Sequence, residues 1–191
     1  MARRTRVLLD VDEVIADFVG YYLKVAGRKM FQEYNHSQVT QWCIPEALRL
    51  PDWAKREVDY ELRRPGTALK LEVLPDAKDA VIAMSEIADI VFVTSPYVGS
   101  QTWANDRYEW LRHHFGDLAE HTVFARHKAP IVGEVFVDDR PENLKSWIAE
   151  NTGAAIVWDK PHNQEFDHPL VKRMNQWEDV IRTVLQKSAT R

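Results

Sequence analysis

Short apolar runs separated by longer helical patterns are the feature of this sequence that most constrains its fold. Four runs of three or four apolar residues, with no polar residue alternating within them, predict strands buried on both faces: residues 7–9, 90–93, 135–137 and 155–158. Residues 122–124 are a shorter candidate. Strands that alternate with helices predict a parallel sheet covered by helices on both faces, so we expect an α/β fold.

Four helices are predicted beside these strands, over residues 14–26, 77–88, 101–115 and 142–151. Glycine stands just beyond three of them, at Gly27, Gly116 and Gly153. A helix often ends in the left-handed conformation that glycine adopts most easily, so we expect these glycines to act as helix caps.

Residues 28–74 interrupt the alternation, because they contain several tryptophans and charges but no strand-like run. Pro51 near its start and Pro65-Gly66 beyond its end predict one helix there, up to Arg64. We interpret residues 28–74 as a small helical cap, inserted into a core formed by residues 1–27 and 75–191. The alternative, ordinary helical packing between two strands, would need an unusually long connection.

The composition excludes several classes of protein. Hydrophobic residues make up 45% of the 191-residue chain, which is too apolar for a disordered protein. The single cysteine, Cys43, excludes a disulfide framework and a cysteine-based zinc cluster and fits a reducing compartment. The net charge of −4 gives no global sign of nucleic-acid binding. No signal-peptide core or membrane-spanning stretch follows the N-terminus, so we expect a cytoplasmic location.

Polar side chains stand where the predicted strands end, which is where ligands bind in open α/β sheets. Three strand ends carry a carboxylate pair, a hydroxyl pair and a second carboxylate pair, with a lysine before the last: Asp10 and Asp12, Thr94 and Ser95, Lys128, and Asp138 and Asp139. Each group alone has an ordinary explanation as a turn, a helix cap or a solvated charge. Their combination at one edge of the sheet favours a shared site.

Phosphoryl transfer is the chemistry that these groups can perform together. Four carboxylates at one edge repel one another unless a cation lies among them, and their hard oxygens suit Mg²⁺. One carboxylate can attack phosphorus and form an aspartyl phosphate, while another exchanges protons with the leaving oxygen and with water. The hydroxyl and ammonium groups can hold the phosphoryl oxygens.

These residues, in this order, resemble the haloacid dehalogenase (HAD) superfamily of phosphatases over nearly the whole chain. Within it, the detail resembles the 5′(3′)-deoxyribonucleotidase family. The fragments that carry this closer resemblance are residues 10–18, 71–75, 94–96, 108–111, 125–128 and 138–141, with His162-Asn163 and residues 177–179 near the C-terminus. The resemblance implies a Rossmann-like HAD core, with a parallel sheet flanked by helices and a small helical cap inserted after the first strand–helix unit.

The resemblance also implies a role for each matching position. Asp10 would be the nucleophile and a Mg²⁺ ligand, and Asp12 the general acid and base, whose backbone carbonyl also contacts the metal. Asp138 would complete the protein ligands, with Asp139 as a supporting carboxylate behind it.

Substrate binding is assigned by the same resemblance. Three positions would bind the phosphate: Thr94, Ser95 and Lys128. Arg126, two residues before the lysine, would lie near the substrate, and Phe18 would face the nucleoside. Residues 28–74 correspond to the family's cap, in which Trp42 stands in a place comparable to that of a base-binding aromatic residue.

Two departures from the family bear on selectivity. Glu13 stands where the first motif of the family usually has glycine. Residues 66–70 stand where the family tends to be aromatic, a difference that concerns nucleobase recognition more than phosphatase chemistry.

We therefore expect a Mg²⁺-dependent phosphomonoesterase that hydrolyses nucleoside or deoxynucleoside monophosphates through an aspartyl phosphate. Two alternatives are a HAD phosphatase for a different small phosphorylated metabolite and a non-catalytic protein that keeps the fold and binds a ligand. The expected partner is a small phosphomonoester, with no nucleic acid polymer and no membrane, and the family adds a homodimer as an expectation.

Overall fold

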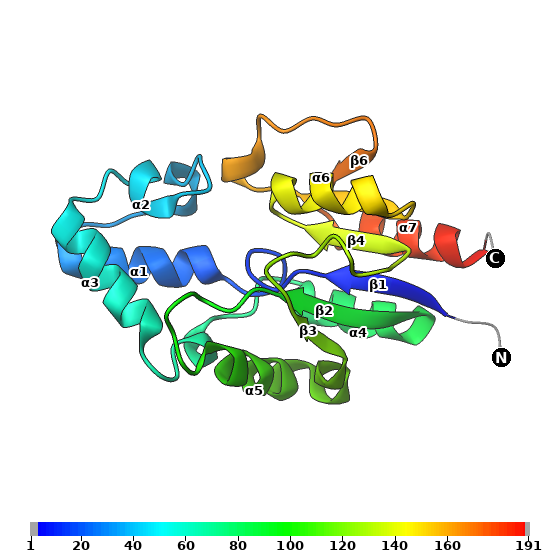
Figure 1. The fold of residues 1–191 in the computed structure, drawn as a ribbon, viewed down its shortest axis with the longest axis horizontal. Coiled ribbons are helices and arrows are strands. Elements are labelled where there is room, and N and C mark those ends of the chain that lie inside the picture. The colour runs from blue at the N-terminus through cyan, green and yellow to red at the C-terminus, as the bar shows by residue number, and fades with distance from the viewer. Residues whose placement is uncertain (1–3, 190–191) are drawn as a thin grey trace.

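A six-stranded parallel sheet forms the core of the computed structural model, which describes residues 4–189 (Figure 1). The strands are β1 (Thr5–Leu9), β2 (Ala88–Thr94), β3 (Thr122–Phe124), β4 (Val135–Asp138), β5 (Ala154–Trp158) and β6 (Val171–Met174). Their order across the sheet is β3-β2-β1-β4-β5-β6, and every neighbouring pair is parallel. The predicted α/β fold is confirmed.

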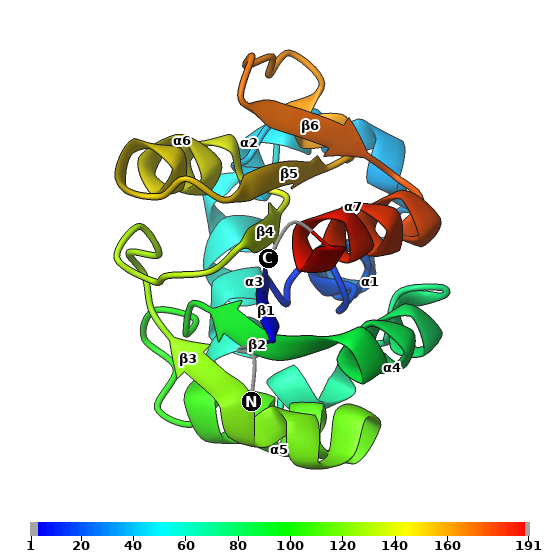
Figure 2. The same ribbon diagram turned by 90° about the vertical axis from the view of Figure 1, so that its right-hand side faces the viewer.

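Helices cover both faces of this sheet (Figure 2). Four of them belong to the core: α4 (Ala77–Ile87), α5 (Trp103–Phe115), α6 (Pro141–Glu150) and α7 (Trp177–Ala189). Val7 and Leu9 of β1 are buried with α4, α5 and α7, whereas Leu8 is buried with α6. Because successive strand residues point to opposite faces, β1 enters both apolar layers, as its uninterrupted apolar sequence predicts.

The edge strand β6 is absent from the sequence prediction. It pairs with β5, and its two central residues, Lys172 and Arg173, are exposed. Charged residues are common on edge strands, where they discourage pairing with other chains. They also interrupt the apolar run by which a buried strand is recognised. Residues 155–158 are the last of the predicted strands, but in the structure β6 follows them and forms the edge of the sheet.

The first helix begins later than predicted. Residues 14–16 are fully buried in a tight turn, which is closed by hydrogen bonds to the carbonyl of Val11. α1 (Phe18–Met30) follows Asp17, whose carboxylate caps the helix by accepting a 2.7 Å hydrogen bond from the amide of Gly20. Residues 14–16 therefore fit a helical period in the sequence, but in the structure they are the buried residues of a turn.

The predicted glycine caps are found at one of the three positions. Gly116 ends α5 with φ 60°. Gly27 lies inside α1, which ends instead at Phe31 in the left-handed conformation with φ 54°. Gly153 has no positive φ, and its role is close approach, because a Cβ there would lie 2.6 Å from the Trp147 ring.

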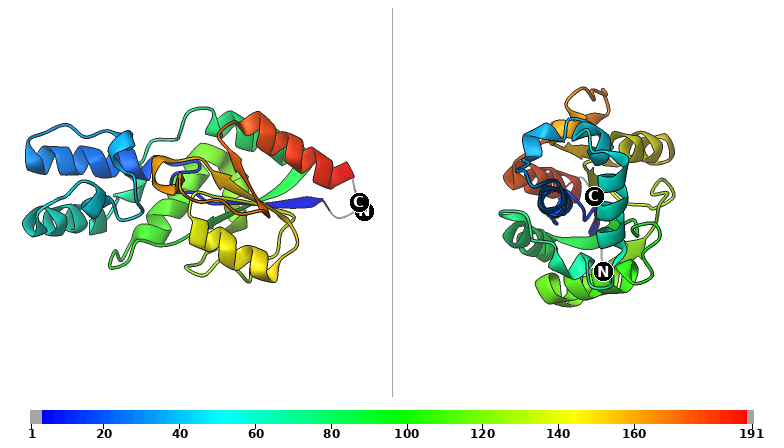
Figure 3. Two further views of the ribbon diagram at one scale, coloured as in Figure 1. Left: turned by 90° about the horizontal axis from the view of Figure 1, so that it is seen from above. Right: turned by 90° about the vertical axis from the view of Figure 1, so that its left-hand side faces the viewer.

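A second buried apolar cluster joins α1 to the inserted helices at the opposite end of the molecule from the sheet (Figure 3). The inserted helices are α2 (Ile44–Ala47) and α3 (Asp52–Arg63), and short 3-10 turns lie at His36–Gln38, Ala68–Lys70, Gly116–His121 and Pro161–Asn163. Val19 of α1 packs with Val58 and Leu62 of α3. We call α1, α2, α3 and their connections the cap lobe; the domain division at residues 28–74 stays a prediction.

The two chain segments that connect the core with the cap lobe lie side by side. Ala16 and Val73 form an antiparallel bridge, and the amide of Asp17 donates a 2.8 Å hydrogen bond to the carbonyl of Glu72. The chain therefore leaves the core and returns to it at one place, beside the end of β1. Within residues 4–189, no helix is both long and apolar enough to cross a membrane.

Candidate active site

The carboxyl ends of the central strands bring the predicted acidic and hydroxyl groups together. In the sheet register Leu9 lies opposite Val137, so Asp10 follows β1 at the level of Asp138. The amide of Asp10 donates a 2.9 Å hydrogen bond to the carbonyl of Val137. Thr94 ends β2 on the other side of β1. Residues that are far apart in the sequence thus meet at one edge.

Lys128 joins two of the carboxylates. Its Nζ lies 2.7 Å from Oδ1 of Asp10 and 2.8 Å from Oδ2 of Asp138, and the lysine is 2% exposed. Burial alone would lower the pKa of the ammonium group, but the two carboxylates raise this pKa above its usual value, so the group stays charged. The amide of Val11 also donates to Oδ1 of Asp10 (2.7 Å), so both contacts use Oδ1 and not Oδ2.

Asp138 and Asp139 differ in their contacts. Asp138 is fully buried and accepts hydrogen bonds from Lys128, from the amide of Arg140 (2.8 Å) and from Nδ2 of Asn143 (3.0 and 3.1 Å). Neither carboxylate oxygen of the buried Asp139 has a well-aligned hydrogen bond among the described residues, although Nε2 of His162 lies 2.9 Å from its Oδ2. Asp138 is therefore held by the protein on several sides, and Asp139 is not.

Three buried carboxylates form a cluster that suits a cation. Ligand oxygens of Asp10, Asp138 and Asp139 all lie within 4.8 Å of one another. Burial and the repulsion of Asp138 raise the pKa of Asp10 well above its usual value, and Lys128 offsets only part of this; burial likewise raises the pKa of Asp139. The carboxylate oxygens of Asp139, which have no well-aligned hydrogen bond among the described residues, are hard ligands of the kind that Mg²⁺ prefers. The residues present fit a divalent metal ion.

The hydroxyl groups after β2 have different surroundings. Thr94 is fully buried, and within the described residues its Oγ1 has no hydrogen-bond partner. The hydroxyl of Ser95 donates to the carbonyl of Ala125 at 2.9 Å. A buried hydroxyl without a partner is costly, so Thr94 is a group that a phosphate oxygen would satisfy.

Asp12 is placed by a residue that no motif in the sequence pointed to. Its carboxylate, 28% exposed, accepts a hydrogen bond at Oδ1 from Nη2 of Arg107, a fully buried residue of α5. The signal available in the sequence was an arginine with Trp103 four residues before it and Trp110 three residues after it, on one helix face. Asn143, in the first turns of α6, was missed in the same way, because an asparagine near a helix start has an ordinary capping explanation.

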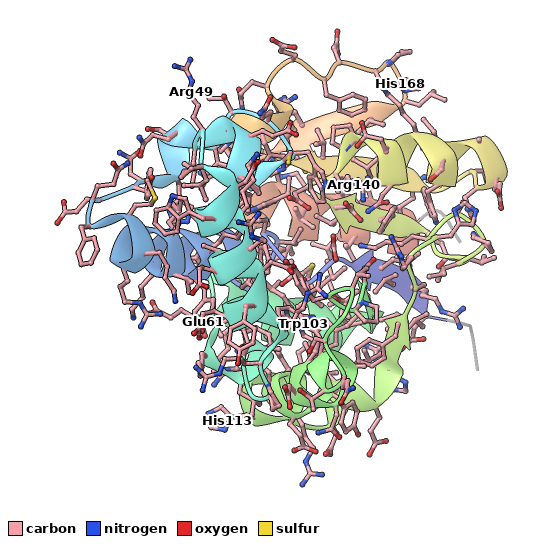
Figure 4. The ribbon with its side chains drawn as sticks, turned by 60° about the vertical axis from the view of Figure 1, so that its left-hand side comes forward. Arg49, Glu61, Trp103, His113, Arg140 and His168 are labelled. Carbon is pink, nitrogen blue, oxygen red and sulfur yellow. The ribbon has the colours of Figure 1, made fainter. Side chains whose placement is uncertain are left out.

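A cavity of about 830 Å³ opens at this edge of the sheet, and residues of both the core and the cap lobe line it. The predicted site residues that line it are Asp10, Asp12, Ser95, Lys128 and Asp139 from the catalytic motifs, and Phe18, Trp42 and Arg126 from the predicted substrate pocket. Trp103 and Arg140 also line it, and in Figure 4 they come from opposite sides of β1. Thr94 and Asp138 lie behind this surface.

Aromatic residues form one wall of the cavity. The ring of Phe18 lies 6.4 Å from Tyr22, 6.2 Å from Tyr97 and 6.0 Å from Trp103, measured between ring centroids. All four residues line the cavity. This wall can accept a flat apolar group such as a nucleobase.

Trp42 reaches the cavity from the cap lobe but is already in contact with the core. The guanidinium of Arg140 lies over its ring, 4.6 Å from the centroid, and the ring of His162 packs against it at 5.5 Å. One face of Trp42 is thus used in a contact between the cap lobe and the core. The tryptophan itself is 50% exposed.

Glu13, which replaces the usual glycine of the first motif, is accommodated by specific contacts. Its φ of 61° lies in the left-handed region that favours glycine. Its buried carboxylate accepts a 2.7 Å hydrogen bond from the amide of Val19 and lies 3.2 Å from Nζ of Lys160. Burial raises the pKa of Glu13, and Lys160 offsets part of that increase. Glu13 therefore links the first motif to α1 and to the segment after β5.

Comparisons with known proteins identify the family. The family described as "5′ nucleotidase, deoxy (Pyrimidine), cytosolic type C protein" matches residues 3–189. The chain belongs to this family. The human protein described as 5′(3′)-deoxyribonucleotidase, cytosolic type, is 32% identical over 200 residues, which cover 97% of this chain and 95% of the human one. A putative 5′(3′)-deoxyribonucleotidase of Staphylococcus aureus is 32% identical over 184 residues, 93% of each chain.

The fold of this 5′-nucleotidase family member is shared more widely. A haloacid dehalogenase-like family hydrolase from Xanthomonas campestris superposes with a TM-score of 0.63 at 15% identity, covering 100% of this chain and 96% of the other. The predicted HAD-like fold, the deoxyribonucleotidase family and the enzyme class, a phosphoric monoester hydrolase of the 5′-nucleotidase type, are confirmed.

Proposed function

We propose that this enzyme hydrolyses deoxyribonucleoside monophosphates through a phosphoryl group carried on Asp10. The observation that carries the proposal is the arrangement around the cavity. A carboxylate, an ammonium group and a second carboxylate line it together, at Asp10, Lys128 and Asp12. Beside them, Thr94 has a buried hydroxyl without a partner in the described chain. This is the set of groups that phosphoryl transfer requires.

The first step transfers the phosphoryl group to the enzyme. Oδ2 of Asp10, which neither Lys128 nor the Val11 amide uses, attacks phosphorus, and the bond from phosphorus to the nucleoside oxygen breaks. The leaving oxygen takes its proton from the carboxyl group of Asp12. The Lys128 ammonium, the Thr94 hydroxyl and Ser95 hold the non-bridging oxygens, whose charge the low-dielectric site would otherwise disfavour.

The second step regenerates the enzyme. The Asp12 carboxylate accepts a proton from water, and the water oxygen attacks phosphorus. The bond from phosphorus to Asp10 then breaks, which restores the Asp10 carboxylate and releases inorganic phosphate.

A divalent cation, which we propose to be Mg²⁺, would be held by Asp10, the backbone carbonyl of Asp12 and a carboxylate of the pair after β4. When bound, it would neutralise charge on the phosphoryl oxygens and on the buried carboxylates. The resemblance assigned Asp138 as the direct ligand, but the contacts favour Asp139. Asp138 is already bonded to Lys128, Asn143 and a backbone amide, whereas Asp139 lines the cavity and has only the His162 ring nitrogen close to its carboxylate among the contacts described above.

The substrate class is supported by the wall of the cavity and by the family. The aromatic group around Phe18 suits a nucleobase, and Arg126 lines the same cavity. The words "deoxy (Pyrimidine)" and "cytosolic type" in the family description support a deoxynucleotide substrate and a cytoplasmic location.

A second candidate is a phosphatase for a different small phosphorylated metabolite. One observation favours it: the cavity is also lined by an ion pair between Nε of Arg63 and Oδ2 of Asp59 (2.7 Å), and the hydroxyl of Tyr97 donates to Asp59 at 2.9 Å. Such groups can bind a polar substituent as readily as a base edge.

A substrate panel separates these two candidates. We expect kcat/KM with Mg²⁺ to be highest for deoxynucleoside 5′- or 3′-monophosphates, compared with ribonucleotides, hexose phosphates and glycerol phosphate. EDTA should abolish turnover, and so should Asp10→Asn in a protein that keeps its fold. Higher kcat/KM for a sugar phosphate would favour the second candidate, and turnover by Asp10→Asn would contradict the mechanism.

A further inference from the structure

Arg107 is a buried cation that has no role in the reaction steps proposed above. It is 0% exposed and lies in the middle of α5. Its guanidinium carbon lies 5.4 Å from the ring centroid of Trp103 and 5.4 Å from that of Trp110. An arginine taken out of water loses its hydration, so it is retained only where its charge is compensated by good contacts.

The hydrogen bonds of Arg107 are directed at one partner. Nη2 donates to Oδ1 of Asp12, while Nε and Nη1 have no hydrogen-bond partner among the described residues. The two indole rings provide attraction through their faces but accept no conventional hydrogen bond. The Asp12 carboxylate is thus the anion that compensates this buried charge.

The position of Arg107 relative to the cavity determines what it can do. Asp12 lines the cavity, and Arg107 does not. Arg107 lies outside the cavity lining and contacts the Asp12 carboxylate, which belongs to that lining. The helix that carries it is anchored, because Nε1 of Trp110 donates a 2.7 Å hydrogen bond to the carbonyl of Leu71, where the chain returns from the cap lobe.

We propose that Arg107 is the positioning residue for the acid–base group of the site. It fixes Oδ1 of Asp12, so that Oδ2 is the oxygen that gives its proton to the leaving oxygen and later takes one from water. An N–H donor can hold Oδ1 in both protonation states, because the carbonyl oxygen of a carboxyl group still accepts a hydrogen bond. This inference rests on the proposed function, since it assigns a partner to the Asp12 of that mechanism.

The leaving group distinguishes this role from simple core packing. Phenyl phosphate and 4-nitrophenyl phosphate have almost the same shape, but phenolate needs a proton as it leaves and 4-nitrophenolate departs readily as the anion. The value of kcat/KM reports the steps up to loss of the leaving group. A mispositioned acid should therefore slow phenyl phosphate selectively, whereas a damaged core should slow both substrates equally.

The test measures kcat/KM with Mg²⁺ for both aryl phosphates. For Arg107→Met we expect kcat/KM to fall roughly tenfold to hundredfold on phenyl phosphate and less than about threefold on 4-nitrophenyl phosphate. The larger fall is part of the roughly 10²- to 10⁴-fold effect of general acid catalysis. Arg107→Lys keeps the charge with a shorter reach, so we expect a smaller loss with the same selectivity; it also serves if Arg107→Met does not fold. Arg112→Met, an exposed arginine on the same helix, is the matched control and should match the wild type on both substrates.

A double-mutant cycle completes the test. If Arg107 acts through Asp12, adding Arg107→Met to Asp12→Asn should cause no further fall in kcat/KM. Equal losses on both substrates, no loss on either, or a further fall in the Asp12→Asn background would overturn the inference while leaving the proposed function intact. A wild-type enzyme that releases no phosphate from either aryl phosphate or from a deoxynucleoside monophosphate would instead overturn the proposed function.

Discussion

Replacing Lys128 with methionine tests the electrostatic balance of the buried site. The lysine Nζ lies 2.7 Å from Asp10 and 2.8 Å from Asp138, and all three residues are less than a tenth exposed. With an effective dielectric constant of about 20, Coulomb's law gives roughly 6 kcal/mol of attraction for each pair at these distances. The cost of removing the ammonium from water offsets a large part of this. The loss expected on removing one partner of a buried ionic group is therefore about 3–5 kcal/mol.

Urea unfolding in the presence of EDTA measures this loss. In thermal unfolding of a chain of this length, a loss of about 3–5 kcal/mol in the free energy of unfolding corresponds to a fall in Tm of roughly 6–20 °C. Lys172→Met, on the exposed edge strand β6, is the matched control and should change the free energy of unfolding by less than about 0.5 kcal/mol.

Addition of Mg²⁺ gives a second measurement on the same proteins. Removal of the lysine leaves the carboxylates of Asp10, Asp138 and Asp139 with less positive charge nearby, so Mg²⁺ should raise the Tm of Lys128→Met more than that of the wild type. A free-energy loss below about 1 kcal/mol, no larger than that of the control, would show that Lys128 does not compensate a buried carboxylate cluster.

Two contacts near the start of α1 can be tested in the same way. Glu13→Gly should destabilise the protein by about 1–2 kcal/mol in urea unfolding. The variant loses the charged hydrogen bond to the Val19 amide and the Lys160 ion pair, and this loss outweighs the relief of a positive φ at residue 13. A gain in stability would show that the backbone strain is the larger effect. His36→Gln tests a pH-dependent pair. The hydrogen bond with Asp17 raises the pKa of His36 above 6.5, so its stabilisation is fully present below pH 6.5 and is lost as the pH rises through the folded-state pKa. The stability difference between wild type and His36→Gln should thus be larger at pH 5.5 than at pH 8.5. The change with pH should be less than about 1 kcal/mol, because the histidine is half-exposed. A difference that does not depend on pH would contradict this prediction.

The sheet and the position of the site could be predicted because they depend on short local patterns. The uninterrupted apolar runs indicated strands buried on both faces, and parallel strands place their carboxyl ends at one edge. Asp10 and Thr94 were therefore expected to lie near each other before any contact was known. Strand β6 escaped prediction because an edge strand can carry charges at positions where a central strand cannot.

Features that depend on contacts distant in the sequence could not be predicted. Residues 14–16 fit a helical period, but the return of the chain at Val73 makes them a buried turn. Asp138 and Asp139 are adjacent and chemically identical, so only the three-dimensional contacts of Lys128 and Asn143 distinguish them. Arg107 was missed for the same reason, since its partner is remote in the sequence.

Direct detection of the phosphorylated enzyme tests whether Asp10 is the nucleophile. Rapid mixing of excess wild-type enzyme, Mg²⁺ and a deoxynucleoside monophosphate, followed by an acid quench and peptide mass spectrometry, should find chains that carry a single phosphoryl group, on Asp10. The intermediate should form before inorganic phosphate appears, and it should be absent in Asp10→Asn. Phosphate release without a phosphorylated intermediate, or a phosphoryl group on another residue, would contradict the assignment of Asp10 as the nucleophile.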